Sequence, residues 1–203
     1  MSAASRDRFT GRILGAGSTS GVRVVVGRWH VSPWGRFSDV MVAEPSGRRI
    51  LLAPDQQVAD YVSATYSFDE VRLGPVSVSG EDAWVVAAPG LDLRVRVGSR
   101  AALGWLLQAV PRPLATSPAW ARVTDPVARR VLRGVRTRGS AGNGRTETYG
   151  AYDLHGVLSL AGRWQGEPLG ELALVSPEPG FGFGSTPERP SVTSLVTTVE
   201  RPG

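Results

Sequence analysis

The chain has no cysteine and no lysine, and these two absences exclude several kinds of chemistry. Without cysteine there is no disulfide, no thiol nucleophile, no thiolate zinc site and no iron–sulfur cluster. Without lysine there is no Schiff base and no lysine general base, which removes pyridoxal-phosphate enzymes from consideration. The two histidines, His30 and His155, are too few for a three-histidine metal centre, and the acidic residues form no ligand-spaced cluster. The sequence therefore predicts no metal and no cofactor.

Long apolar runs are also missing from the chain. The N-terminus has no apolar segment of the kind found in signal peptides, and no stretch approaches the length of a transmembrane helix. These absences predict a cytoplasmic protein without a transmembrane segment. The sequence leaves the oligomeric state open.

Glycine and proline are abundant, with 25 and 15 of the 203 residues. This content is too high for a helical bundle and favours many short strands joined by turns. Patterns rich in β-branched residues recur, at 22–31, 37–43, 49–53, 68–78, 83–88, 91–97, 146–155, 157–164, 171–175 and 192–199. Helical patterns interrupt them at 54–65, 100–110 and 124–134.

These patterns predict a mainly β fold. The expected architecture is a single antiparallel β-barrel-like domain of about ten strands, closed or nearly closed, over residues 21–200. Short helical insertions are expected near 54–65 and 98–134. Residues 1–20 are polar and end in a glycine-rich stretch, so they are predicted to form a flexible N-terminal arm.

Positive charge is concentrated in one segment. Eleven of the arginines lie between Arg94 and Arg145, a stretch whose only acid is Asp125. Such a field attracts an anion, which could be a nucleic acid, an anionic lipid surface or an acidic small molecule. The segment has no RNA-binding aromatic motif and no helix-turn-helix pattern, so nucleic acid is the less favoured of these partners. The alternative is a solvated surface in a protein whose only cation is arginine.

The stretch from Gly139 to Thr146 has the glycine spacing of a phosphate-binding P-loop, with Arg145 in place of the required lysine. A P-loop opens a helix, whereas the residues after this one predict a strand. The guanidinium also does not replace the compact ammonium in a tight phosphate cradle. We therefore predict a hairpin loop here.

Candidate catalytic residues lie in the stretch 146–155. If it is a regular strand, Tyr149, Asp153 and His155 share one face. An aspartate beside a histidine can orient the ring and raise its basicity, giving a general acid/base pair, and Tyr149 could add a hydroxyl. The alternative is an ordinary polar pair on a solvated strand face.

Candidate ligand-binding residues come from the strand 91–97 and from the tryptophans. Arg94 and Arg96 share one strand face, and inside a barrel they could grip a carboxylate or phosphate with bidentate hydrogen bonds. On the outside they would be solvated. The apolar segment 100–110 is interpreted as a core helix or a lid over a ligand cavity. Trp29, Trp105 and Trp164 are the candidate cavity-lining residues.

The tripeptide Gly27-Arg28-Trp29 resembles the Gly-x-Trp signature of lipocalin-like (calycin) β-barrel proteins, and Gly162-Arg163-Trp164 repeats it. The stretches 27–37 and 162–172 match at a constant offset. The resemblance implies a barrel with one end closed by the tryptophan, which packs against an arginine from a late strand. It also implies a mostly apolar small molecule inside.

Together these patterns predict that the protein binds a small, largely apolar ligand with an acidic group inside a β-barrel. Two alternatives stay open. One is a barrel-based enzyme that uses His155 and Asp153 as acid and base. The other is electrostatic binding of nucleic acid or anionic lipid through the arginine-rich segment 94–145.

Overall fold

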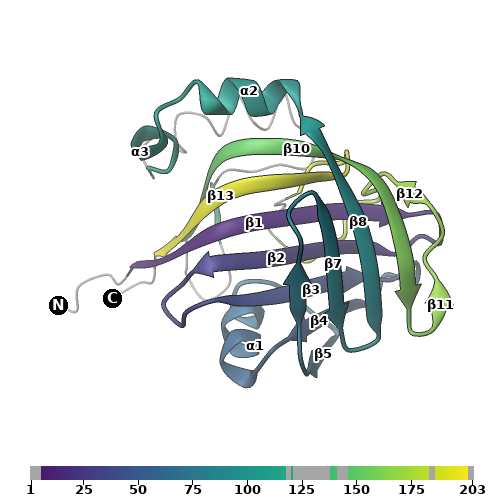
Figure 1. Ribbon diagram of the computed structural model, residues 1–203. Coiled ribbons are helices and arrows are strands. Elements are labelled where there is room, and N and C mark those ends of the chain that lie inside the picture. Colours follow the sequence, from purple (N-terminus) through teal and green to yellow (C-terminus); the bar gives the residue numbers. More distant parts are fainter. Residues whose placement is uncertain (1–5, 118–119, 121–137, 141–145, 183–185, 201–203) are drawn as a thin grey trace.

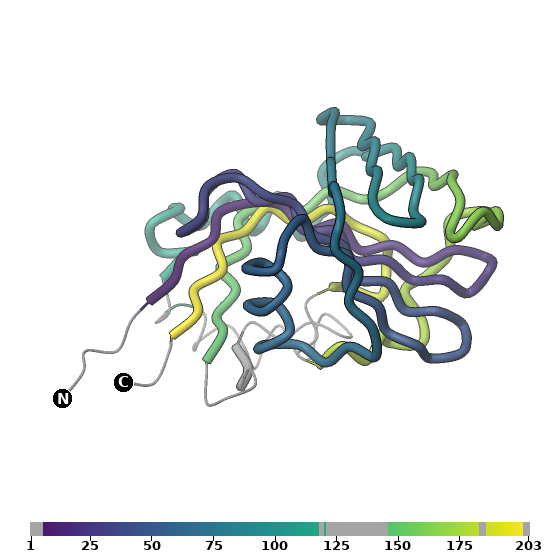
Figure 2. Tube along the Cα trace, turned by 90° about the horizontal axis from the view of Figure 1, so that it is seen from below, coloured from purple at the N-terminus to yellow at the C-terminus, as the bar shows by residue number. Residues whose placement is uncertain are grey.

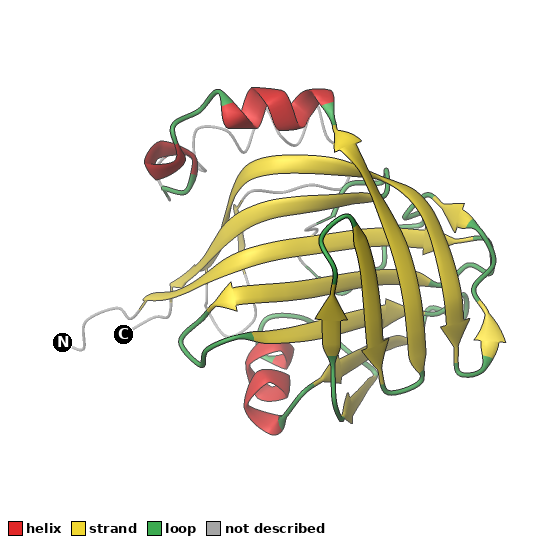
Figure 3. Cartoon of the chain, viewed as in Figure 1, coloured by secondary structure: helices red, strands yellow, loops and turns green. Residues whose placement is uncertain are grey.

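The computed structural model describes residues 6–117, 120, 138–140, 146–182 and 186–200. Strands make up 55% of the described residues and helices 12%, which confirms the predicted mainly β class (Figure 3). The prediction of a closed antiparallel barrel is wrong. One mixed sheet curls into a half-barrel of ten strands, and its two edge strands do not pair with each other (Figure 1).

The sheet follows the order β5-β4-β3-β2-β1-β13-β10-β8-β7-β6, while β9 and β11 pair with β10 and β12 pairs with β1. All neighbouring strands are antiparallel except β4 and β5, which are parallel and joined through α1. The strands are β1 (Arg6–Ser18), β2 (Arg23–Val31), β3 (Phe37–Ala43), β4 (Arg49–Ala53), β5 (Glu70–Leu73), β6 (Ser77–Ser79), β7 (Ala83–Ala88), β8 (Leu91–Arg100), β9 (Arg138–Ser140), β10 (Thr146–Trp164), β11 (Glu167–Pro168), β12 (Leu172–Ala173) and β13 (Ser191–Glu200). The described helices are α1 (Gln56–Ser63), α2 (Ala102–Gln108) and α3 (Arg112–Ala115).

Two of the three described helices, α1 and α2, lie where helical patterns predicted them, whereas α3 lies in none of the predicted patterns. The side chain of Asp55 caps α1 by accepting a hydrogen bond from the Val58 amide at 2.9 Å. The second pattern, 100–110, forms α2. The third, at 124–134, lies outside the described residues. None of the described helices is long and apolar enough to cross a membrane.

The N-terminal stretch is a central strand and not the predicted arm. Arg6–Ser18 forms β1, which lies between β2 and β13 (Figure 2). Its glycines permit close contact with neighbouring backbone, since a Cβ on Gly11 would lie 2.3 Å from the carbonyl oxygen of Arg28. Glycines that suggested a loop in the sequence are therefore required by tight strand packing.

The sheet is buried on both faces in its central strands. On the concave face, Leu14, Val26 and their neighbours pack against Trp84 and Leu93 of the opposite wall. On the other face, a second cluster of residues packs beneath α1, among them Ile13, Val25, Met41, Leu51, Val58 and Ala59. Because both faces are covered there, β3 and β4 contain continuous apolar runs, at 40–43 and 50–53, instead of alternating patterns. Each fully buried aliphatic side chain contributes about 1.5–3 kcal/mol to stability.

Candidate functional site

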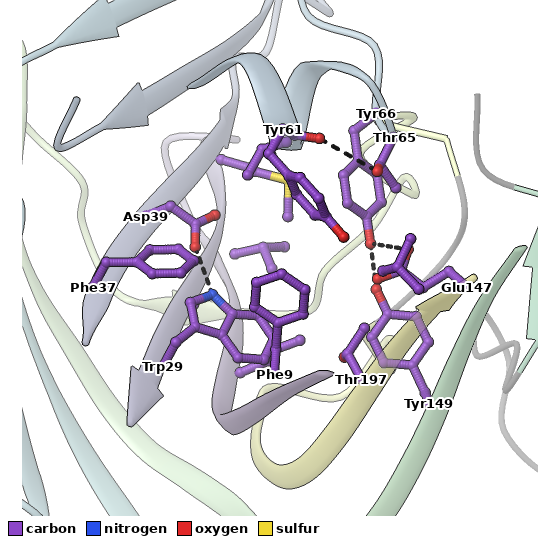
Figure 4. Close-up of a pocket in the computed structure, with 16 residues that line it drawn as sticks. Phe9, Trp29, Phe37, Asp39, Tyr61, Thr65, Tyr66, Glu147, Tyr149 and Thr197 are labelled. Carbon is purple, nitrogen blue, oxygen red and sulfur yellow. Dashed lines mark hydrogen bonds between the residues drawn. The ribbon is translucent and has the colours of Figure 1, made fainter. Parts of the chain in front are cut away.

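A pocket lies between α1 and the sheet face beneath it (Figure 4). It encloses a cavity of about 50 Å³. Its walls are mainly apolar, and six of its lining residues are aromatic: Phe9, Trp29, Phe37, Tyr61, Tyr66 and Tyr149. We call it the aromatic pocket.

Phe9 of β1 organises the aromatic wall. Its ring centroid lies 5.7 Å from that of Trp29 in an edge-on arrangement and 5.3 Å from that of Tyr61 on α1. These spacings are typical of favourable aromatic pairs. The rings therefore fix α1 against β1 and β2 at this end of the sheet.

Asp39 of β3 is one of two buried acids in the pocket. Its side chain is 4% exposed and accepts a hydrogen bond from the indole Nε1 of Trp29 at 2.9 Å. Burial raises the pKa of Asp39 to about 6, against the lowering effect of that hydrogen bond. Gly27 lies opposite, where a Cβ would be 2.4 Å from the Asp39 Oδ1 atom.

Glu147 of β10 is the second buried acid, on the other side of the pocket in Figure 4. The hydroxyl of Tyr66 donates a hydrogen bond to its Oε2 atom at 3.0 Å, and the hydroxyls of Tyr66 and Tyr149 are hydrogen-bonded to each other. Burial raises the pKa of Glu147 to about 7, the tyrosine hydrogen bonds oppose this rise, and the charge of Asp39 adds to it. Burial and the charge of Glu147 also raise the pKa of Tyr66, which therefore stays a hydrogen-bond donor.

A second pocket lies on the opposite face of the same sheet. Its volume is about 480 Å³ and its lining is polar, with Arg12, His30 and Ser194 from the sheet and Gln108 and Arg112 from the α2–α3 region. We call it the polar cleft. Ile13 lines the aromatic pocket and Arg12 lines the cleft, because consecutive side chains of a strand point to opposite faces.

The predicted catalytic residues do not all come together. A β-bulge lies at Tyr152, since Ala151 pairs with Leu195 while Asp153 pairs with Ser194. The extra residue reverses the alternation of faces. The predicted common face is therefore wrong for Tyr149, which lines the aromatic pocket, whereas Asp153 lines the polar cleft.

Asp153 and His155 are neighbours, as predicted, but each has other partners. The Nε2 atom of His155 lies 3.4 Å from Asp153 Oδ2, and its Nδ1 atom lies 3.1 Å from the Gly98 carbonyl oxygen. Arg100 binds Asp153 through two hydrogen bonds of 2.8 and 3.1 Å. Burial tends to raise the pKa of Asp153, but the Arg100 and backbone hydrogen bonds outweigh it and hold that pKa below its usual value. His155 is not among the residues that line either pocket.

The predicted ligand-binding residues are dispersed over the molecule. Arg94 and Arg96 are exposed on the outer face of β8. Trp29 lines the aromatic pocket, whereas Trp105 on α2 is 62% exposed. Trp164 is buried in the concave core, where its indole donates to Glu44 Oε1 at 2.8 Å.

Much of the arginine-rich segment lies outside the described residues, which omit 121–137 and 141–145. The same holds for the centre of the P-loop-like stretch. Thr146, the last residue of that stretch, begins β10, so a strand follows the glycine-rich loop as predicted.

Sequence reasoning missed the two buried acids and Tyr66. One signal was available for each acid. Asp39 is the one charged residue in the largely apolar strand Phe37–Ala43, and Glu147 is two residues from Tyr149 and so shares its strand face. A charge within a buried strand marks a position where burial shifts a pKa.

No protein-family model, curated protein or solved structure matches the chain. The resemblance to calycin barrels therefore remains a prediction.

Within the described part of the chain, no three His, Asp or Glu side chains come together as a metal-binding group.

Proposed function

We propose that the protein binds a small, largely apolar ligand in the aromatic pocket, and that a basic or hydrogen-bond-donating group of the ligand contacts Asp39 and Glu147. The observation that supports this is the pair of buried carboxyl groups in an otherwise aromatic and apolar wall. Pockets of this composition, with a few converging polar groups and shifted pKa values, are typical ligand sites.

The donors and acceptors of the pocket favour a basic ligand over the acidic one expected from the sequence. No arginine or histidine is among the described residues that line the pocket, while two carboxyl groups are. An ionised acid placed there would meet like charge in a poorly solvated site, which is strongly unfavourable. An ammonium group would instead receive charge-assisted hydrogen bonds.

The size of the cavity limits what enters it. A cavity needs a volume of about 10–15 Å³ to hold one water molecule. A cavity of about 50 Å³ therefore accommodates a head group of a few heavy atoms. The remainder of a larger ligand would extend from the mouth of the pocket along its aromatic rim.

Three probes of similar size and different charge test the proposal: butylamine, butanol and butyrate. Met41 lines the pocket, and Met1 is the only other methionine of the chain. Labelling the methionine methyl groups with ¹³C therefore gives two NMR signals, one in the pocket and one as an internal reference. We expect butylamine at pH 8 to shift the Met41 signal, butanol to shift it more weakly, and butyrate to leave it unchanged.

Variants of the two acids sharpen the test. Asp39→Asn and Glu147→Gln keep the shape of each side chain and remove its charge, so each should weaken butylamine binding about tenfold. Asp92→Asn, the same chemical change at an exposed position of β8, is the matched control. Butyrate binding as strong as butylamine binding would overturn the basic-ligand proposal, and a Met41 signal that no probe shifts would overturn the site.

The enzyme hypothesis is a second candidate because His155 lies 3.4 Å from Asp153. It predicts a pH-dependent activity that is lost in His155→Ala. Electrostatic binding through residues 94–145 is a third, and it predicts an affinity that falls steeply with salt.

A further inference from the structure

The polar cleft has the features of an anion site. Its lining residues come from both the sheet and the α2–α3 region, and six of them have side chains that can donate a hydrogen bond: Arg12, His30, Gln108, Arg112, Tyr152 and Ser194. Its volume of about 480 Å³ exceeds the need of a bare ion. We propose that the cleft binds a small phosphate monoester, whose phosphate group lies between Arg12 and Arg112. This site is independent of the ligand proposed for the aromatic pocket.

Arg112 is the principal anion contact in this proposal. Its guanidinium carbon lies 4.3 Å from the centroid of the Tyr152 ring, which positions the group over the aromatic face. Among the described residues, no carboxylate forms an ion pair with Arg112, and none accepts a hydrogen bond from its guanidinium. The side chain thus presents a full set of donors to a ligand, in a geometry that suits phosphate oxygens.

The other charges around the cleft leave an excess of positive charge. Glu81 is shared by two arginines, with Arg12 at 2.6 Å and Arg28 at 3.3 Å. Asp153, the one acid among the described residues that line the cleft, is bound by Arg100 through two hydrogen bonds. Together with Arg112 these groups are two carboxylates and four guanidinium groups, of which Asp153, Arg12 and Arg112 line the cleft. A phosphate monoester, which carries up to two negative charges, would compensate the difference.

The pKa of His30 depends on the charges around the cleft. Burial lowers the pKa of His30, the positive charges of Arg28, Arg12 and Arg36 lower it further, and Glu81 acts in the opposite direction. A phosphate group between Arg12 and Arg112 would counter the repulsion, so it should raise the pKa of His30. His155, the only other histidine, does not line the cleft but lies 3.4 Å from Asp153, which does.

Titration of the full chain with inorganic phosphate and with phenyl phosphate, at constant ionic strength, tests the proposal. We expect both to bind, with phenyl phosphate the tighter because its ring contacts Val110, Pro111 and Tyr152. Arg112→Gln and Arg12→Gln should each weaken phosphate binding about tenfold or more. NMR titration of the imidazole signals should show that phosphate raises the pKa of His30 in the wild-type chain and has little effect on it in Arg112→Gln.

Arg163→Gln is the matched control, because Arg163 is exposed near the far end of β10, where it donates to the Gly166 carbonyl. Equal weakening in Arg163→Gln and Arg112→Gln would reduce the effect to general electrostatics and overturn the site. Acetate binding as strong as phosphate binding would overturn the phosphate class, and stronger binding to phosphatidic acid vesicles than to phenyl phosphate would overturn the small-molecule source. The Met41 methyl signal should not respond to phosphate, so failure of this site and failure of the aromatic pocket are distinguishable.

Discussion

The aromatic pocket and the polar cleft are built on opposite faces of the same strands, yet their chemistry is opposite. β1, β2, β10 and β13 contribute residues to both. One face presents aromatic rings and two buried acids, and the other presents arginines and hydroxyl groups. The difference follows from strand alternation together with the cover on each face, which is α1 on one side and the α2–α3 region on the other (Figure 1). A single sheet can therefore present two pockets of opposite chemistry.

The largest effect that separates the two sites is expected from Gly27→Ala. A Cβ there would lie 2.4 Å from Asp39 Oδ1 and 2.6 Å from Trp29 Nε1, so it would break their hydrogen bond and fill the pocket. We expect a loss of about 1–3 kcal/mol in the free energy of unfolding, measured with urea, and loss of butylamine binding. Phosphate binding in the cleft should be retained.

Gly156→Ala is the control for that substitution. A Cβ at Gly156 meets nothing within 4 Å, although the residue also lies in a strand. It should leave both binding reactions intact. If Gly27→Ala kept butylamine binding, or if it also abolished phosphate binding, the separation of the two sites would be wrong.

A second effect, which concerns the aromatic pocket alone, is the pH dependence of stability. Folding raises the pKa of Asp39 from 3.8 to about 6 and that of Glu147 from 4.5 to about 7. Above the unfolded pKa the unfolded chain releases these protons more readily, so stability decreases as the pH rises from about 4 to about 7 and then levels off. A rise of this size in one pKa corresponds to about 3 kcal/mol.

Unfolding free energies measured between pH 5 and 8 check this expectation. Asp39→Asn and Glu147→Gln should each reduce the decrease and be more stable than the wild type at pH 8. The pKa of Asp69 is lowered by its hydrogen bonds with Arg49, so ionisation of Asp69 increases stability as the pH rises, and it does so only at lower pH. A wild-type free energy of unfolding that stays flat or rises between pH 5 and 8 would show that folding does not raise the pKa values of Asp39 and Glu147.

The fold class and two helices could be predicted from the sequence because they depend on local patterns. Asp55 before an apolar face predicts a helix start, and the alternation of Leu91, Leu93 and Val95 predicts a strand. Closure of the sheet depends on whether its two edges meet, which no local pattern encodes. The strand β1 was missed because its glycines serve contacts with β2 that are distant in sequence.

The sites were harder to predict than the fold. A single bulge at Tyr152 separates Tyr149 from Asp153, and the composition of the strand gives no sign of it. The two buried acids belong to β3 and β10, which are far apart in the sequence. Whether both acids line one pocket therefore depends on the order of strands in the sheet. By contrast, the pairing of Asp153 with His155 was predictable because it lies within one strand.

The smallest effect is expected from Arg94→Gln and Arg96→Gln. The sequence suggested these arginines as anion anchors, but both are exposed on the outer face of β8, between Leu93 and Val95, whose side chains point to the core. Each substitution should change the free energy of unfolding by no more than about 0.5 kcal/mol. Because neither residue lines either pocket, butylamine and phosphate should bind both variants as they bind the wild type. Weaker phosphate binding in these variants than in Arg112→Gln would instead place the anion site on β8. The polar cleft would then not be the anion site, and the proposed contrast between the two faces of the sheet would be wrong.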